Sequence, residues 1–137
     1  MTRQQMWVSS VTIGAPNPRD LAVFYQRLLG WTISAMEDPR PGEPPEAGWA
    51  QLCAPADLPG LRTINIEYER YYTRPVWPSE PGRQHITVHL DLPVEDLDAA
   101  QARALEAGAT LADTQPQDAV RVILDPAGHP VCLFSSA

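Results

Sequence analysis

Over residues 86–92 polar and apolar side chains alternate, a pattern typical of a strand with one buried face. Thr87, His89 and Asp91 fall on one face of this strand, and aliphatic residues fall on the other. Burial of the aliphatic face is enough to hold a strand in a sheet. A histidine between a threonine and an aspartate on the opposite face therefore either meets water or lines a cavity, and this choice decides which functions are open to the protein.

The same patterns predict a strand, a helix and three strands, twice in succession. Asn17 and Pro18 are a typical helix start, since asparagine caps helices and proline suits the first helical position, and Gly30 is a typical stop. A second helix is expected over residues 96–107, before Gly108. Strands are expected over residues 7–13, 31–36, 49–53, 62–68, 86–92, 110–112, 120–124 and 131–134.

This order is an internal repeat with a proline-rich segment between its halves. Superposing the halves in sequence places Ser10 on His89. We expect an α+β fold of two βαβββ modules, residues 1–69 and 85–137, joined by a linker over residues 70–84 within one compact domain. Each module has a helix on only one face of its sheet, so the two open faces can form a curved mixed sheet around a cleft.

Composition narrows the range of partners. The chain has 137 residues, a net charge of −7 and a pI near 4.8, and its ten lysines and arginines form no cluster. This charge argues against nucleic acid and against an anionic membrane surface, and it could attract a cationic small molecule. Two cysteines are too few for a disulfide scaffold, and no stretch approaches the roughly 20 apolar residues of a membrane helix. We expect a cytoplasmic protein with reduced thiols and no membrane partner.

Four stretches of the chain resemble the vicinal oxygen chelate superfamily, which includes glyoxalases, extradiol dioxygenases and bleomycin-resistance proteins. They are NPRDLAVFYQRLLGW at residues 17–31, HLDLPVEDLDAA at 89–100, AGATL at 107–111 and DPAGHPVCL at 125–133. They occur in the family's order and span nearly the whole chain. The Trp77-Pro linker and the turn that begins at Asp125 are most similar to an uncharacterised glyoxalase-like branch. The resemblance also implies a homodimer.

Enzymes of this superfamily typically hold a divalent metal, and the resemblance places the corresponding positions at Ser10, His89 and Cys132. Only His89 matches the usual ligands, whereas catalytic sites normally hold a metal with three protein ligands. We therefore favour no metal and no other cofactor; if a divalent metal binds, we expect His89 and Glu67 to hold it. Cys132 is expected to pack as a small apolar residue, and His129 to be an exposed, structural residue of a tight turn.

Two functions stay open. The first is a glyoxalase-like protein that binds a small organic molecule in the cleft without the family's usual metal. Its ligand contacts are expected from Ser10, Thr12, Trp49, Asn65, Glu67, Trp77, His89 and Cys132. The second is an enzyme of the lyase, isomerase or dioxygenase type, with His89 and Asp91 as its catalytic residues. In it, His89 would work with Glu67 or Asp91 in metal binding or in acid–base chemistry, because the ordinary pKa of histidine suits proton transfer.

Overall fold

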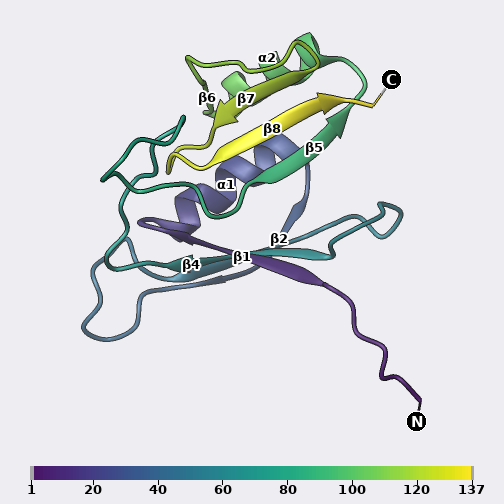
Figure 1. Cartoon of the computed structure of the whole chain (residues 1–137). Helices are drawn as coiled ribbons and strands as arrows, with labels where there is room; N and C mark the ends of the chain where they lie inside the picture. The colour runs from purple at the N-terminus through teal and green to yellow at the C-terminus, as the bar shows by residue number, and fades with distance from the viewer. Residues whose placement is uncertain (1, 137) are drawn as a thin grey trace. The chain divides into compact units, whose positions relative to one another are not determined.

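The computed structural model describes residues 2–136, and the chain divides into two compact units. The first unit extends to Arg70 and the second begins at Tyr71 (Figure 1). Each unit folds as strand, helix and three strands, so the predicted pair of βαβββ modules is confirmed. Within residues 2–136 no helix is both long enough and apolar enough to cross a membrane.

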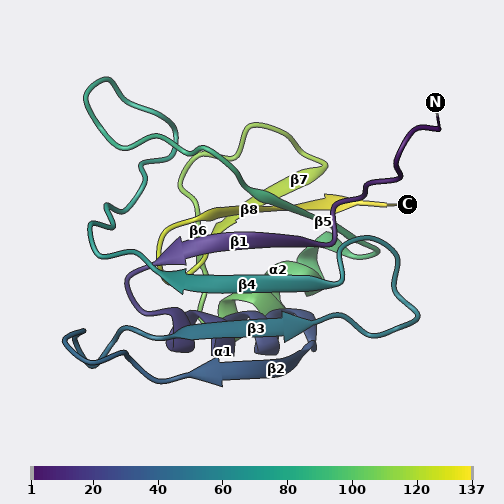
Figure 2. The same cartoon turned by 90° about the horizontal axis from the view of Figure 1, so that it is seen from below.

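The first unit is a four-stranded mixed sheet with one helix. Its elements are β1 (Ser10–Ala15), α1 (Pro18–Leu29), β2 (Thr32–Glu37), β3 (Trp49–Cys53) and β4 (Thr63–Tyr68). The strands lie in the order β1-β4-β3-β2, as Figure 2 shows, with β1 parallel to β4 and the other neighbours antiparallel. We call this sheet the first sheet.

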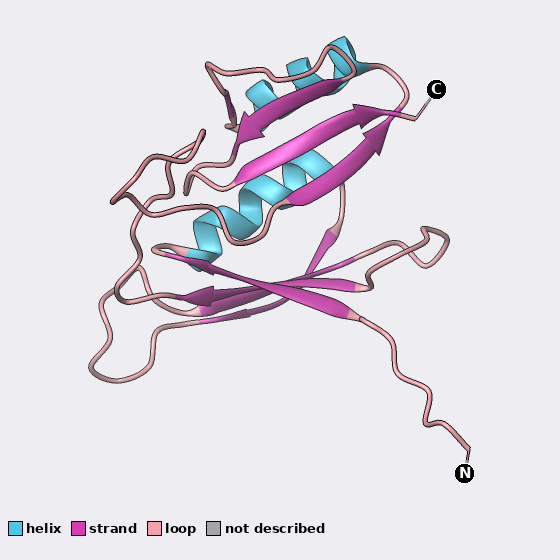
Figure 3. Ribbon diagram, in the orientation of Figure 1, coloured by secondary structure: helices cyan, strands magenta, loops and turns pink. Residues whose placement is uncertain are grey.

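Helix α1 covers one face of the first sheet (Figure 3). It begins and ends where the sequence predicts: the Asn17 side chain accepts a hydrogen bond from the Asp20 amide, and Gly30 closes the helix in the left-handed conformation at φ 71°. Apolar side chains at helical spacing then pack on the sheet. The buried core of this unit comprises Leu21, Ala22, Phe24, Tyr25 and Leu28 from the helix and Ala50, Leu52, Ile64 and Ile66 from the strands.

The second unit repeats the plan. Its elements are β5 (Leu90–Val94), α2 (Leu97–Ala107), β6 (Thr110–Leu111), β7 (Val120–Leu124) and β8 (Pro130–Ser135). The strand order is β5-β8-β7-β6, again with the first and last strands of the unit parallel to each other. Asp96 caps α2 through a hydrogen bond from the Ala99 amide, at the start of the helix predicted over residues 96–107.

Two strands begin several residues later than predicted. The strand expected over residues 86–92 begins only at Leu90, so Thr87 and His89 lie in the segment before it. The reason lies in the partner strand: Leu90 pairs with Val131, so the residue opposite His89 would be Pro130, which has no N–H to donate. The first strand begins at Ser10, and the preceding residues 6–8 are 75–83% exposed.

Candidate functional site

The face of the first sheet opposite α1 collects most of the predicted ligand-binding side chains. Strand alternation sends Val11, Ile64 and Leu52 toward the helix and their sequence neighbours to the other face, here called the open face. Five predicted residues lie on the open face, and they come from β1, β3 and β4: Ser10, Thr12, Trp49, Asn65 and Glu67. Their role in binding stays a prediction.

Strand register arranges the open face in rows that run across the sheet. Glu37, Trp49 and Glu67 stand directly opposite one another on β2, β3 and β4, and we call them the acidic–aromatic row. The next row contains Gln51 of β3, opposite Asn65 of β4, which in turn lies opposite Thr12 of β1; with Ser34 of β2 we call it the amide row. A third row begins with the hydroxyls of Ser10 and Thr63, which hydrogen-bond each other.

The amide row is a continuous chain of side-chain hydrogen bonds. The Ser34 hydroxyl donates to Gln51 Oε1 at 3.1 Å, Gln51 Nε2 donates to Asn65 Oδ1 at 2.8 Å, and Asn65 Nδ2 donates to Thr12 Oγ1 at 3.5 Å. Each amide therefore has a fixed orientation and still has donor or acceptor capacity for another molecule.

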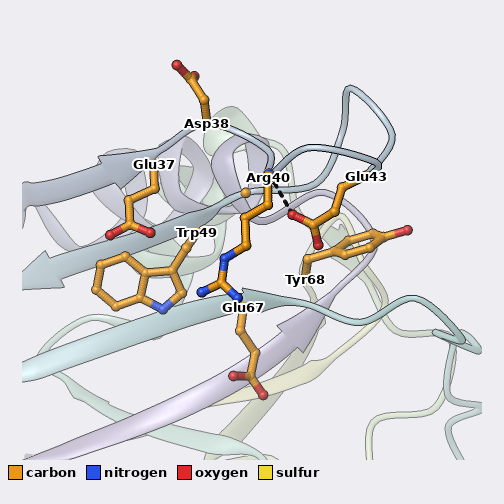
Figure 4. Close-up of a pocket in the computed structure, with 8 residues that line it drawn as sticks. Glu37, Asp38, Arg40, Glu43, Trp49, Glu67 and Tyr68 are labelled. Atoms are coloured by element: carbon orange, nitrogen blue, oxygen red, sulfur yellow. Dashed lines mark hydrogen bonds between the residues drawn. The ribbon is translucent and has the colours of Figure 1, made fainter.

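A pocket of about 340 Å³ lies at the acidic–aromatic row. Trp49, Glu37, Glu67 and Tyr68 line it from the strands, and Arg40 lines it from the loop between β2 and β3. Figure 4 shows the Arg40 side chain reaching from this loop into the space between Trp49 and Tyr68, with its guanidinium toward Glu67. The pocket is within the size range of small-ligand sites.

The loop that carries Arg40 is held in place at several points. Arg19 of α1 donates to the Pro45 carbonyl at 2.5 Å and pairs with Asp38 at 3.4 Å. Glu43 accepts a hydrogen bond from the Arg40 amide at 2.7 Å. At the loop's end Gly48 has φ 119°, and a side chain there would collide with the carbonyl oxygen of Glu37. The pocket wall is thus built from specific contacts with the helix and the strand.

A second group of polar side chains lies in the second unit. His89 Nδ1 is 3.1 Å from Asp91 Oδ1, and Asp91 lies opposite Cys132 on β8. The ligand atoms of these three side chains all lie within 4.8 Å of one another. Burial, with the charge of Asp91 and a hydrogen bond to it, raises the pKa of the Cys132 thiol, so Cys132 is a protonated donor to Asp91.

The comparisons with known proteins agree with this two-module geometry. The glyoxalase-like domain family matches residues 10–134. The chain belongs to this family. The predicted membership of the vicinal oxygen chelate superfamily is thereby confirmed. No curated protein matches the sequence.

Solved structures with the same fold have low sequence identity to this glyoxalase-like chain. A glyoxalase family protein from Enterococcus faecalis is 22% identical, with 93% of this chain and 96% of that chain covered and a TM-score of 0.63. A glyoxylase/bleomycin resistance protein/dioxygenase domain from Frankia sp. EAN1pec is 19% identical, with coverage of 98% and 94% and a TM-score of 0.63. TnmS3, an antibiotic binding protein from Streptomyces sp. CB03234, is 18% identical, with coverage of 99% and 100% and a TM-score of 0.58. These similarities establish the fold.

The glyoxalase-like fold raises the question of a metal, and the second unit has a donor set that fits one. The group has three donor atoms: a nitrogen of His89, an oxygen of Asp91 and the sulfur of Cys132. Three protein ligands are typical of catalytic metal sites. Asp91 is a donor that the family positions Ser10, His89 and Cys132 did not include. The alternative pair of His89 with Glu67 draws on two different units, and it stays a prediction, as does ligand binding by Trp77 of the second unit.

Several residues of the site were not predicted from the sequence. Gln51 carried a detectable signal, because it is a polar residue between buried Ala50 and Leu52 on a strand. Arg40 carried none, since the loop around it has no periodic pattern. Glu37 lies just outside the strand predicted over residues 31–36, although it ends β2 and stands opposite Trp49.

His129 differs most from its predicted setting. Its side chain is only 18% exposed, and its Nδ1 lies 2.8 Å from Oδ2 of the buried Asp125. Its other ring nitrogen lies 3.3 Å from the Tyr72 hydroxyl, which donates to the Ala127 carbonyl at 2.6 Å. This cluster attaches the segment after Arg70 to the turn between β7 and β8. The expectation of an exposed histidine was wrong, because a tight turn can surround a side chain that its own aspartate binds.

Tyr72→Phe tests this attachment through its pH dependence. Burial first, and then the charge of Asp125, raise the pKa of Tyr72 from 10.0 to about 12, against a smaller opposite effect of Arg74. The folded protein holds the phenolic proton more tightly, so this contribution to stability is present below pH 10 and is lost as the pH rises toward 12. We expect Tyr72→Phe to lower the free energy of unfolding at neutral pH by about 1 kcal/mol and to remove part of its alkaline decline.

Urea unfolding on both sides of this pH range measures the effect. Tyr71→Phe is the matched control, because Tyr71 is the neighbouring tyrosine and is 79% exposed. An equal alkaline decline in the wild type and in Tyr72→Phe would contradict the expected role of Tyr72.

Proposed function

We propose that this glyoxalase-like protein binds a small organic molecule on the open face of the first sheet, in the cleft predicted between the two modules. The observation that carries the proposal is the continuous hydrogen-bonded amide row beside a pocket with an aromatic floor. Ordered amides give a ligand fixed donors and acceptors, and Trp49 gives it an apolar surface. TnmS3, a structural neighbour, is an antibiotic binding protein, which supports small-molecule binding as a role of this fold.

The test is a panel of flat organic compounds screened by melting temperature and by tryptophan fluorescence. Gln51→Leu removes the central amide of the row and replaces it with a side chain of similar volume. We expect compounds that stabilise the wild type to lose most of their effect on this variant. Equal stabilisation of both proteins would place binding elsewhere and overturn the proposal.

A second candidate function rests on the His89, Asp91 and Cys132 group. These side chains would hold a divalent ion, and the ion would supply Lewis-acid polarisation of a bound oxygen. Without an ion, Asp91 orients His89 for proton transfer, since the two side chains are within hydrogen-bond reach of each other. This candidate is an enzyme, as the names of several structural neighbours suggest.

Elemental analysis and a melting-temperature screen against divalent ions test the second candidate. If it holds, one ion raises the melting temperature by several degrees, and His89→Ala and Cys132→Ser each remove that rise. The variant Cys53→Ser is the control, because Cys53 is the other thiol of the chain and lies in the first unit. An equal rise in the wild type and in His89→Ala would exclude this group as the metal site.

We also propose a homodimer, as the family resemblance implies. The edge strands β2 and β6 leave backbone groups of each sheet open to pairing. Sedimentation of the wild-type protein at several concentrations would test this expectation, and a single monomeric species would contradict it.

A further inference from the structure

The acidic–aromatic row has the chemistry of a cation site. Glu37 and Glu67 stand on either side of Trp49 in register, and opposed side chains on neighbouring strands have Cβ atoms about 5 Å apart. Trp49 therefore stands between two glutamates, one on each neighbouring strand. An aromatic face attracts a cation through its quadrupole, and adjacent carboxylates add to that attraction.

Neither carboxylate of this row forms an ion pair with another residue in the described part of the chain. Among residues 2–136 the ion pairs involve other acidic residues, such as Asp38 with Arg19, and none involves Glu37 or Glu67. Glu43 accepts the amide of Arg40 at the rim. Glu37 and Glu67 thus remain available to a ligand, in a protein whose net charge is −7.

Within residues 2–136, Arg40 is the one positively charged residue that lines this pocket, against four carboxylates. Its guanidinium lies in the space between Trp49 and Tyr68 and points toward Glu67 (Figure 4). A ligand that carries a flat cation can take the same place beside Trp49 and Tyr68. Arg40 takes that position by reaching in from a loop, and its side chain is exposed enough to leave.

We infer that the pocket binds an organic cation, an ammonium, amidinium or guanidinium group attached to a flat apolar part, and that Arg40 occupies the place of this cation in the ligand-free protein. This inference rests on the proposed function, because it names the ligand class for the same face. The flat part lies on Trp49, the cationic group lies beside Glu67, and the amide row hydrogen-bonds any neighbouring polar groups. Binding moves the Arg40 side chain out of the pocket.

Three isosteric probes separate charge from shape. Benzamidine, benzamide and benzoate are planar and nearly equal in size, and they are cationic, neutral and anionic near neutral pH. We expect benzamidine to bind about tenfold more tightly than benzamide, and benzoate to bind more weakly than either. Titrations followed by amide chemical shifts give the three dissociation constants and the location of each probe. Added salt should reduce the preference for benzamidine, because these charges face solvent.

Substitutions at two exposed residues, Glu67 and Arg40, should change the affinity for benzamidine in opposite directions. Glu67→Gln should weaken benzamidine binding about fivefold, with little effect on benzamide. Arg40→Gln should strengthen benzamidine binding about threefold, because the competing guanidinium is gone. Unchanged melting temperatures of both variants would show that the fold is intact. Weaker benzamidine binding by Arg40→Gln would overturn the inference, because it would make Arg40 a ligand contact.

The outcomes distinguish the inference from the function on which it rests. If benzamide or benzoate binds the open face as tightly as benzamidine, the face binds organic molecules but does not select cations, and only the inference fails. If neither the three probes nor any flat compound of the wider panel shifts an amide of β1, β3 or β4, the inference and the proposed function both fail. Selective binding of benzamidine, strengthened by Arg40→Gln and weakened by Glu67→Gln, supports both.

Discussion

Asp125→Ala is expected to lower the free energy of unfolding by about 3 kcal/mol. The Asp125 side chain is only 1% exposed and accepts hydrogen bonds from the amides of Ala127 and His129. It also binds the ring of His129 at 2.8 Å. Alanine leaves these donors buried without the carboxylate, and an unsatisfied buried donor costs more than the bond it loses.

Urea unfolding at neutral pH measures this loss. Asp113→Ala is the matched control, since it removes an exposed aspartate from the same unit and is expected to change stability by less than about 0.5 kcal/mol. A loss below about 1 kcal/mol for Asp125→Ala would mean that the turn between β7 and β8 keeps its shape without the carboxylate.

Trp49→Ala is expected to weaken the binding of flat organic compounds about thirtyfold, because stacking and apolar contact with an indole contribute on the order of 2 kcal/mol. Trp49 lies on the open face of the first sheet, away from the core beneath α1, so the fold should survive the substitution. Titration of the variant with any compound that binds the wild type gives the ratio of dissociation constants.

Trp7→Ala is the control for this prediction. Trp7 lies before β1 and is 80% exposed, so the same substitution there removes a tryptophan outside the proposed site. If Trp7→Ala weakens binding as much as Trp49→Ala, the ligand does not select the open face. Trp77→Ala tests separately the sequence-based prediction that Trp77 of the second unit contacts the ligand.

Local sequence signals predicted the helices well. Asn17 and Pro18 begin α1, and Gly30 ends it, because capping and left-handed closure depend on residues within a few positions. The repeat of strand, helix and three strands then followed from order alone. Alternation also placed Ser10 and Asn65 correctly on a polar strand face.

The features that depend on distant partners were not predictable in this way. The strand expected over residues 86–92 begins only at Leu90, because its neighbour β8 begins with a proline that has no N–H to offer. Tyr72 and His129 meet only because a segment without periodicity packs on a turn far along the chain. Arg40 enters the pocket from a loop with several prolines, and no sequence pattern fixes where such a loop directs a side chain.

Amide chemical-shift mapping is the sharpest test of the proposal that the open face of the first sheet binds a small organic molecule. A flat compound that stabilises the protein is titrated into the isotope-labelled chain, and every shifted amide is assigned. We expect the largest shifts in β3 and β4 around Trp49, Gln51 and Asn65, with smaller ones in the loop that carries Arg40. Shifts confined to the residues around Cys132 and Asp91 would contradict the claim and favour the second candidate function.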